Sequence, residues 1–127
     1  MELFRLTAHE LHDKLTRREV SATEITRSVL DRTEKAEPKI RSFITRMAET
    51  ALQQAAAVDA KIARGETIAP LAGIPGALKD NMCTNGVKTT CASKILANFV
   101  PPYDATIIEK LAADDAVIVG KANLDEF

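Results

Sequence analysis

Two lysines occupy matching positions in this sequence, each directly after a run of small or apolar residues. The stretches LKDN (78–81) and GKAN (120–123) both place an asparagine two residues beyond the lysine. Open α/β sheets bind their ligands beyond the carboxyl ends of parallel strands. If both stretches end such strands, we expect the polar groups of Lys79 and Lys121 to form one site.

Lys79 is the candidate catalytic residue, in the role of a general base. A lysine accepts a proton only as the neutral amine, and burial against apolar strands favours that form because desolvation penalises the ammonium ion. Two plainer interpretations stay open. Lys79 could form an ion pair with an acid such as Asp80 or Glu109, or lay its stem along the surface with the charge in water. Lys121 is a weaker candidate for the same role.

A nucleophile for acyl transfer is not evident among the four serines. Ser21 is typical of a helix cap, Ser28 falls inside a predicted helix, and Ser42 lies just beyond that helix. Ser93 lacks glycine-rich surroundings that could form an oxyanion hole. Neither a GxSxG elbow nor an SxxK pair is present. The residues alone therefore do not assemble a complete hydrolytic site.

The histidines and cysteines indicate no metal centre. His9 and His12 are three residues apart in HELH, whereas the zinc motif HExxH separates its histidines by four. We expect them on a solvated helix face. Cys83 and Cys91 match neither a CxxC redox pair nor a zinc knuckle, so they are expected to be reduced thiols in ordinary packing.

Composition narrows the class of protein. The 127 residues suit one domain, and 17 basic against 18 acidic residues give a net charge of −1, so no basic field indicates nucleic-acid binding. No apolar run approaches the roughly 18 residues of a membrane span. The start, MELFRLTAHE, is unlike a secretory leader. We therefore expect a cytoplasmic protein.

Helices dominate the first half of the chain. Thr7 with Glu10, and Ser21 with Glu24, have the spacing of capping boxes and predict two helix starts. The second helix is expected to end at Glu37, because proline follows it. An alanine-rich third helix should stop at a glycine. The predicted helical ranges are 7–16, 21–36 and 48–63, with Gly65 as the final stop.

The second half reads as alternating strands and a helix. We expect a strand at 77–79, a bend at Asn85-Gly86, a helix over 105–113 capped by Asp104, and a buried apolar strand at 116–119. This order predicts a βαβ-like crossover. A short extended segment is also expected within 40–45. The chain thus divides into a helical front (1–66) and an α/β part (67–127). So few strands need neighbours, which indicates part of a larger sheet.

The stretch PLAGIPGALKDNMCTNGVKTTCASKILANFVPPYDATIIEKL, followed by AVIVGKANLDEF, resembles the amidase signature enzymes. The lysine of KDN is shared by that family generally. The combination of TTCASKIL, NFVPPYDAT and VGKANLDEF is narrower and is similar to the glutaminase subunits of tRNA-dependent amidotransferases. The SATEIT helix start extends the resemblance into the helical front, so essentially the whole chain is covered.

The resemblance implies an incomplete amidase signature fold, an α/β architecture whose N-terminal helices pack on the first strands of a mixed β-sheet. It implies that Lys79 acts, through one serine, on a second, nucleophilic serine. That serine would release ammonia from glutamine, and a partner subunit using ATP and Mg²⁺ would convert Glu-tRNA(Gln) into Gln-tRNA(Gln). Subunits B and C would complete a heterotrimer, and no cofactor is expected in this subunit.

The resemblance also has gaps. The family's two serines lie in a Gly/Ser-rich segment that this chain does not contain, so the chain is expected to be an N-terminal portion of the enzyme, inactive alone. Gly76 stands where relatives usually have an apolar residue, and Asp115 stands where a glycine is usual. The alternatives are a fragment of another amide hydrolase of this family and a non-catalytic, stand-alone binding module.

Overall fold

The computed structural model describes residues 2–127. Helices and strands follow one another in a mixed order, beginning with a short 3₁₀ turn at Leu3–Arg5. Their bounds are α1 Ala8–Thr16, α2 Ala22–Ile40, β1 Phe43–Arg46, α3 Ala48–Ala63, β2 Pro75–Lys79, α4 Thr106–Ala113 and β3 Val117–Ala122. No helix in the described range 2–127 has both the length and the apolar character needed to cross a bilayer.

Both predicted capping boxes are confirmed. The Thr7 hydroxyl accepts the backbone N–H of Glu10, whose carboxylate in turn accepts the N–H of Thr7. Ser21 and Glu24 make the same reciprocal pair at the start of α2. Each box satisfies N–H groups that have no partner inside the helix.

The expected end of the second helix was wrong. Helix α2 continues to Ile40 with Pro38 inside it, and Arg41 ends it in a left-handed conformation at φ 53°. Proline removes only one donor here, near an exposed helix end. The Glu37 carboxylate then accepts the N–H groups of Ser42 and Phe43 beyond the helix. Those bonds fix the backbone of residues 42 and 43 just beyond the helix, so the helix tolerates its proline.

The cap expected for the fourth helix was also wrong. Ala105 precedes α4 without a side-chain cap. The Oδ1 of Asp104 instead accepts the backbone N–H of Asn85, 2.7 Å away in a loop that is distant in sequence. The bend itself is confirmed, because Thr84 and Val87 form an isolated bridge around Asn85-Gly86.

The three strands form a mixed sheet in the order β1-β3-β2. Strands β2 and β3 are parallel and are joined through α4, which confirms the predicted crossover, and β1 runs antiparallel to β3. Strand β3 is therefore central, and β2 lies at an edge of this sheet. The strand predicted at 116–119 begins one residue later, at Val117, and continues to Ala122.

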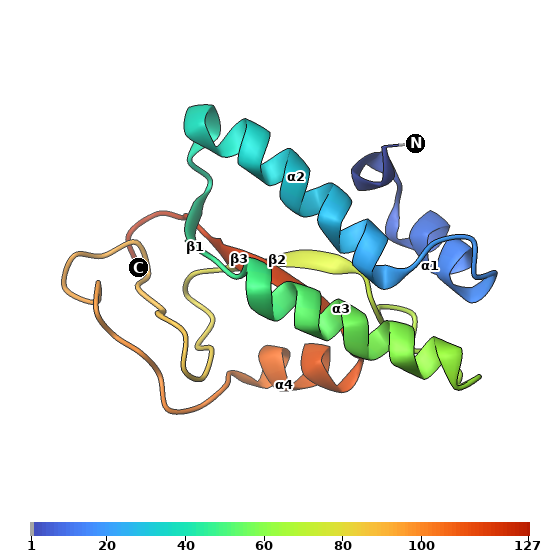
Figure 1. Cartoon of the computed structure of the whole chain (residues 1–127). Coiled ribbons are helices and arrows are strands. Elements are labelled where there is room, and N and C mark those ends of the chain that lie inside the picture. Colours follow the sequence, from blue (N-terminus) through green and yellow to red (C-terminus); the bar gives the residue numbers. More distant parts are fainter. Residues whose placement is uncertain (1) are drawn as a thin grey trace.

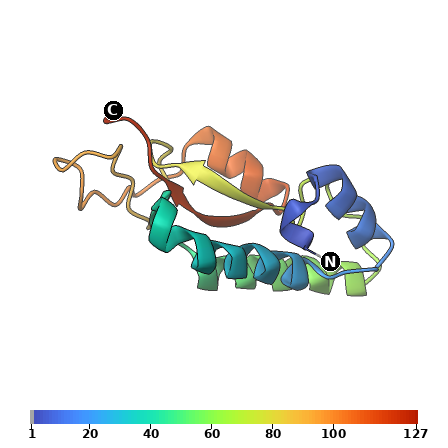
Figure 2. The ribbon, with the colours of Figure 1, turned by 90° about the horizontal axis from the view of Figure 1, so that it is seen from above.

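Helices cover both faces of the sheet. Helices α2 and α3 lie along one face and α4 along the other (Figures 1 and 2). The main core joins α1, α2 and α3 to the first face, through residues such as Leu15, Ile25, Val58, Val117 and Val119. A smaller cluster of Leu78, Ile108 and Ile118 joins α4 to the second face. This α/β arrangement is the predicted one.

Candidate active site

Lys79 is the last residue of β2, at the carboxyl end of the strand as predicted. It lies opposite Ala122 of β3 in the register, and the next backbone N–H, that of Asp80, donates to the Ala122 carbonyl at 3.0 Å. The Lys79 carbonyl accepts the N–H of Met82 at 3.1 Å, which begins the following loop. The side chain of Lys79 is exposed. None of the ion pairs found within residues 2–127 includes it.

Lys121 has the opposite environment. Its side chain is fully buried, although a lysine is almost never buried without a partner. It lies opposite Leu78 in the register, one position before the Lys79–Ala122 pair. Side chains alternate across a sheet, so the two lysines point to opposite faces. The expectation that both would form one polar site is therefore wrong.

A register shift decides the face on which Lys121 lies. Gly76 pairs with Ile118, whereas Ala77 pairs with Gly120, so Val119 is an extra residue in β3. Such a bulge reverses the alternation that follows it. Without the bulge, Lys121 would share the face of Val119 and project into the main core between the sheet and helices α2 and α3. With it, Lys121 projects on the other face, towards the loop that follows β2.

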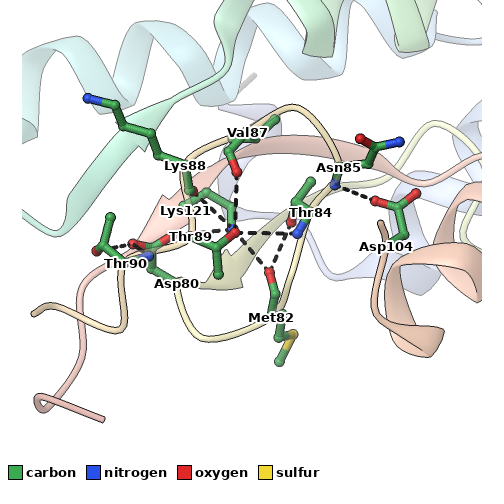
Figure 3. A network of polar contacts seen from close by, with 10 residues as sticks. All are labelled: Asp80, Met82, Thr84, Asn85, Val87, Lys88, Thr89, Thr90, Asp104 and Lys121. Carbon is green, nitrogen blue, oxygen red and sulfur yellow. Dashed lines mark hydrogen bonds and ion pairs between the residues drawn. The ribbon is translucent and has the colours of Figure 1, made fainter. Parts of the chain in front are cut away.

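The Lys121 ammonium group is surrounded by oxygen atoms (Figure 3). Its Nζ donates to the Met82 carbonyl at 3.1 Å, the Thr89 Oγ1 at 3.0 Å and, more weakly, the Lys88 carbonyl at 3.5 Å. The Oδ1 of Asp80 lies 3.3 Å away. An ammonium group has three donors and no acceptor, which suits a cage made only of acceptors. This arrangement therefore fixes the position of the Lys121 amine.

Asp80 completes the buried network. It is fully buried, and its Oδ2 accepts the N–H of Thr90 at 3.0 Å and the Thr90 hydroxyl at 2.5 Å. Its carbonyl accepts the N–H of Cys91 at 2.9 Å. Its Oδ1 makes the ion pair with Lys121 but lacks the angles of a hydrogen bond. The carboxylate and the ammonium therefore hold one loop between them.

Sequence reasoning missed this network. It considered Asp80 only as a partner of Lys79, whereas Asp80 pairs with Lys121. Thr89 and Thr90 were not considered at all. The available signal was a lysine directly after the apolar run AVIVG, because a charge at the end of a fully buried strand needs a partner. Asp80, the acid next to the lysine of KDN, was a possible partner for Lys121.

The other polar candidates are spread over the fold. Ser93 is buried, and with Asn123 it lines a hollow of about 390 Å³ beyond the carboxyl end of β3. Ser21 is a helix cap, as predicted. His9 is exposed on α1. Across residues 2–127 no group of three or more His, Cys, Asp or Glu side chains is placed to hold a metal ion. Both cysteines are free thiols.

Comparison with known proteins identifies the family. A model of the protein family described as "Amidase" matches residues 24–127, which is most of the chain. The chain belongs to the amidase family. The resemblance drawn from the KDN and GKAN segments is thereby confirmed.

Two curated relatives show what share of their length this chain covers. The chain is 65% identical over 127 residues to the glutamyl-tRNA(Gln) amidotransferase A subunit of Heliobacterium modesticaldum, and 61% identical over 118 residues to the protein of that name in Nostoc punctiforme. The matches cover 100% and 93% of this chain but 26% and 24% of those proteins. The chain thus spans about a quarter of the length of the curated relatives it matches.

Solved structures support the same fold. The native peptide amidase from Stenotrophomonas maltophilia superposes with a TM-score of 0.88 at 32% identity, covering 96% of this chain and 25% of that one. A chain from a vestigial protein complex, linked to the origins of an s-triazine catabolic enzyme, superposes with a TM-score of 0.91 at 32% identity. It covers 95% of this chain and 27% of that one. The expected incomplete amidase signature fold is confirmed.

Proposed function

We propose that this chain is part of the glutaminase subunit of a tRNA-dependent amidotransferase, which releases ammonia from glutamine to convert Glu-tRNA(Gln) into Gln-tRNA(Gln). One observation carries the proposal. Four relatives that bear the name of the glutamyl-tRNA(Gln) amidotransferase A subunit match all 127 residues at 65, 59, 56 and 54% identity. The matched region includes both lysine motifs and the helical front.

Lys79 is the general base in this proposal. Its position at the carboxyl end of a parallel strand supports the role, because ligands of open α/β sheets bind there. The cage of acceptors around Lys121 supports it further, because the Lys121 amine is already engaged in hydrogen bonds to the Met82 carbonyl and the Thr89 hydroxyl. Lys79 would relay a proton through one serine from a second, nucleophilic serine, which attacks the side-chain amide of glutamine. A glutamyl ester forms and ammonia leaves.

The remaining parts of the reaction belong to other segments and subunits. The two serines come from a Gly/Ser-rich segment that is not among these 127 residues, so the isolated chain is inactive. Subunits B and C complete a heterotrimer, and the partner subunit uses ATP and Mg²⁺ to activate the acceptor glutamate. This chain itself holds no cofactor. Because the acceptor is an aminoacyl-tRNA, the assembly works in the cytoplasm.

The decisive experiment replaces Lys79 in the complete heterotrimer and measures ammonia release from glutamine. Lys79→Ala is expected to lower kcat by at least about 100-fold, the lower end of what a positioned acid or base contributes. Lys110→Ala, which removes an exposed lysine of α4, is the matched control and should leave kcat unchanged. Wild-type ammonia release by Lys79→Ala would refute the role of Lys79.

A second candidate is an amide hydrolase that acts on another class of amide. The similarity to the peptide amidase of Stenotrophomonas maltophilia favours it. The two candidates differ in substrate, so the complete protein is assayed with glutamine and with a C-terminally amidated peptide. Ammonia from glutamine, enhanced by Glu-tRNA(Gln) and ATP, supports the amidotransferase. Ammonia from the peptide amide alone supports the hydrolase.

A further inference from the structure

The buried Asp80–Lys121 pair lies directly beside the residue that carries the proposed chemistry. Asp80 follows Lys79 in sequence, and Lys121 lies opposite the residue before it, Leu78. Neither charged side chain is exposed. A buried ion pair seldom adds net stability over apolar residues of similar volume, so its presence calls for another explanation. Its position suggests one.

The Lys121 ammonium holds the loop that leaves β2. Three of its four oxygen partners belong to residues 82–89, and the fourth is the Asp80 carboxylate. This single cation therefore closes the loop back onto the central strand. Removing the ammonium group would take one donor from each of these oxygens and would leave the buried Asp80 carboxylate without its counter-charge, while Thr84 alone would still donate to the Met82 carbonyl and the Thr89 Oγ1.

The Asp80 carboxylate fastens the far side of the same loop. Its two bonds to Thr90, together with the bond from the Cys91 N–H to its carbonyl, connect residue 80 to residues 90 and 91. The Asp80 N–H also donates to Ala122 of β3. The backbone directly after Lys79 is thus held from the central strand and from the loop at once.

Lys79 itself remains free of this network. Its side chain leaves the sheet on the opposite face, and its backbone is held by the register with Ala122 and the turn to Met82. A reacting group displaced by about 1 Å loses roughly 100-fold in rate, so a fixed attachment point matters for a long, flexible side chain.

We propose that Asp80 and Lys121 are positioning residues, whose buried ion pair sets the place and direction from which Lys79 reaches the reacting serine. The inference rests on the proposed role of Lys79 as the base. Lys121 takes no part in the transfer. The pair acts through the backbone of residues 79 and 80.

The test uses the complete heterotrimer and begins at Thr90, because substitutions there leave both charges paired. Thr90→Val removes the hydroxyl that donates to Asp80, and Thr90→Ser keeps it. Thr90→Val is expected to lower kcat for ammonia release by between about tenfold and 100-fold. The KM for glutamine should change by no more than about twofold. Thr90→Ser should retain the wild-type kcat.

Asp80→Asn is the stronger variant and has a matched control in Asp59→Asn. The Asp59 carboxylate accepts three hydrogen bonds from Ala22 and Thr23 at the start of α2, in a different part of the fold. Both variants should lower the melting temperature, but only Asp80→Asn should lower kcat per folded enzyme. It should also move the pH at which kcat is half-maximal, a change that lost stability alone does not produce.

Two outcomes would overturn the inference. One is a wild-type kcat and pH profile in folded Thr90→Val. The other is an Asp59→Asn enzyme that loses kcat as Thr90→Val does, which would make the effect one of general stability. If Lys79→Ala itself keeps full activity, the proposed function fails instead. An inactive Lys79→Ala beside a fully active Thr90→Val rejects the positioning role alone.

Discussion

The Nζ of Lys121 lies 3.3 Å from the Oδ1 of Asp80, and neither side chain is exposed to solvent. The two residues are adjacent only because β2 and β3 pair in parallel with an extra residue at Val119. The two buried charges are therefore paired only when the sheet has this register. A register slip would leave both charges without a partner.

Breaking this pair should strongly destabilise the protein. Lys121→Met leaves the buried Asp80 carboxylate uncompensated, which is expected to lower the free energy of unfolding by about 3–5 kcal/mol. Urea unfolding of the full-length protein measures it. Adding Asp80→Asn to Lys121→Met removes the orphaned charge, so the double variant should be more stable than Lys121→Met. A double variant whose loss equals the sum of the two single losses would contradict the coupling.

Two glycines of the sheet should respond in opposite ways to alanine. A Cβ at Gly120 would lie 2.7 Å from both the Phe43 ring and the Thr45 carbonyl oxygen, whereas a Cβ at Gly76 meets nothing within 4 Å. Gly120→Ala is expected to lower the free energy of unfolding by about 1–3 kcal/mol through overpacking. Gly76→Ala should raise it by up to about 1 kcal/mol, because glycine loses more freedom on folding.

Urea midpoints of the two variants, compared with the wild type, check this difference. Equal midpoints for Gly120→Ala and Gly76→Ala would show that β1 moves aside freely. Such a result would contradict the close approach of Phe43 to the central strand. The Gly76 result also tests whether the glycine weakens β2.

Asp115 should make stability depend on salt. It has a φ of 57°, a left-handed conformation that suits glycine, and its carboxylate lies 2.5 Å from the Lys61 amine in a partly exposed ion pair. Asp115→Gly relieves backbone strain of about 1 kcal/mol and loses an ion pair that contributes up to about 1 kcal/mol. The two effects nearly cancel at low ionic strength.

High salt screens the ion pair in the wild type, so Asp115→Gly should become more stable than the wild type as sodium chloride is raised from about 0.01 M to about 1 M. Thermal unfolding at several salt concentrations measures it. Asp115→Asn, which keeps a residue tolerant of the left-handed region, isolates the loss of charge. A stability difference for Asp115→Gly that is constant with salt would rule out a contribution from Lys61.

Glu37 should make stability depend on pH below neutrality. Hydrogen bonds from the Ser42 side chain, and then from the N–H groups of Ser42 and Phe43, hold the pKa of the Glu37 carboxyl below its ordinary value of 4.5. A lowered pKa in the folded state means that the stabilisation is complete above pH 4.5 and is lost as the pH falls through the folded-state pKa. Glu37→Gln should therefore be less stable than the wild type at neutral pH.

The stability difference between Glu37→Gln and the wild type should shrink as both proteins are acidified below pH 4.5. Urea unfolding across the acid range follows it. Asp31→Asn changes an exposed carboxyl on the same helix and serves as the control. If Glu37→Gln and Asp31→Asn show the same pH dependence, the cap beyond α2 does not contribute through its charge.

Local signals predicted the helix starts because both partners of each capping box lie within one turn. Thr7 and Ser21 needed only a glutamate three residues later. The two wrong predictions about helix ends depended on partners that are not part of the helix itself. Pro38 is tolerated because Glu37 binds the chain beyond the helix, and Asp104 caps nothing because it binds Asn85.

The sequence by itself determined the pair of lysine motifs, the helix starts, the parallel crossover and the family, since all of these depend on residue types at short, readable spacings. Only the tertiary structure decided which lysine is buried. The extra residue at Val119 turns Lys121 towards the loop after β2, where Asp80 and Thr89 meet it, and leaves Lys79 on the other face. A charge is stabilised by its neighbours in space, and those neighbours are assembled by the register of two strands.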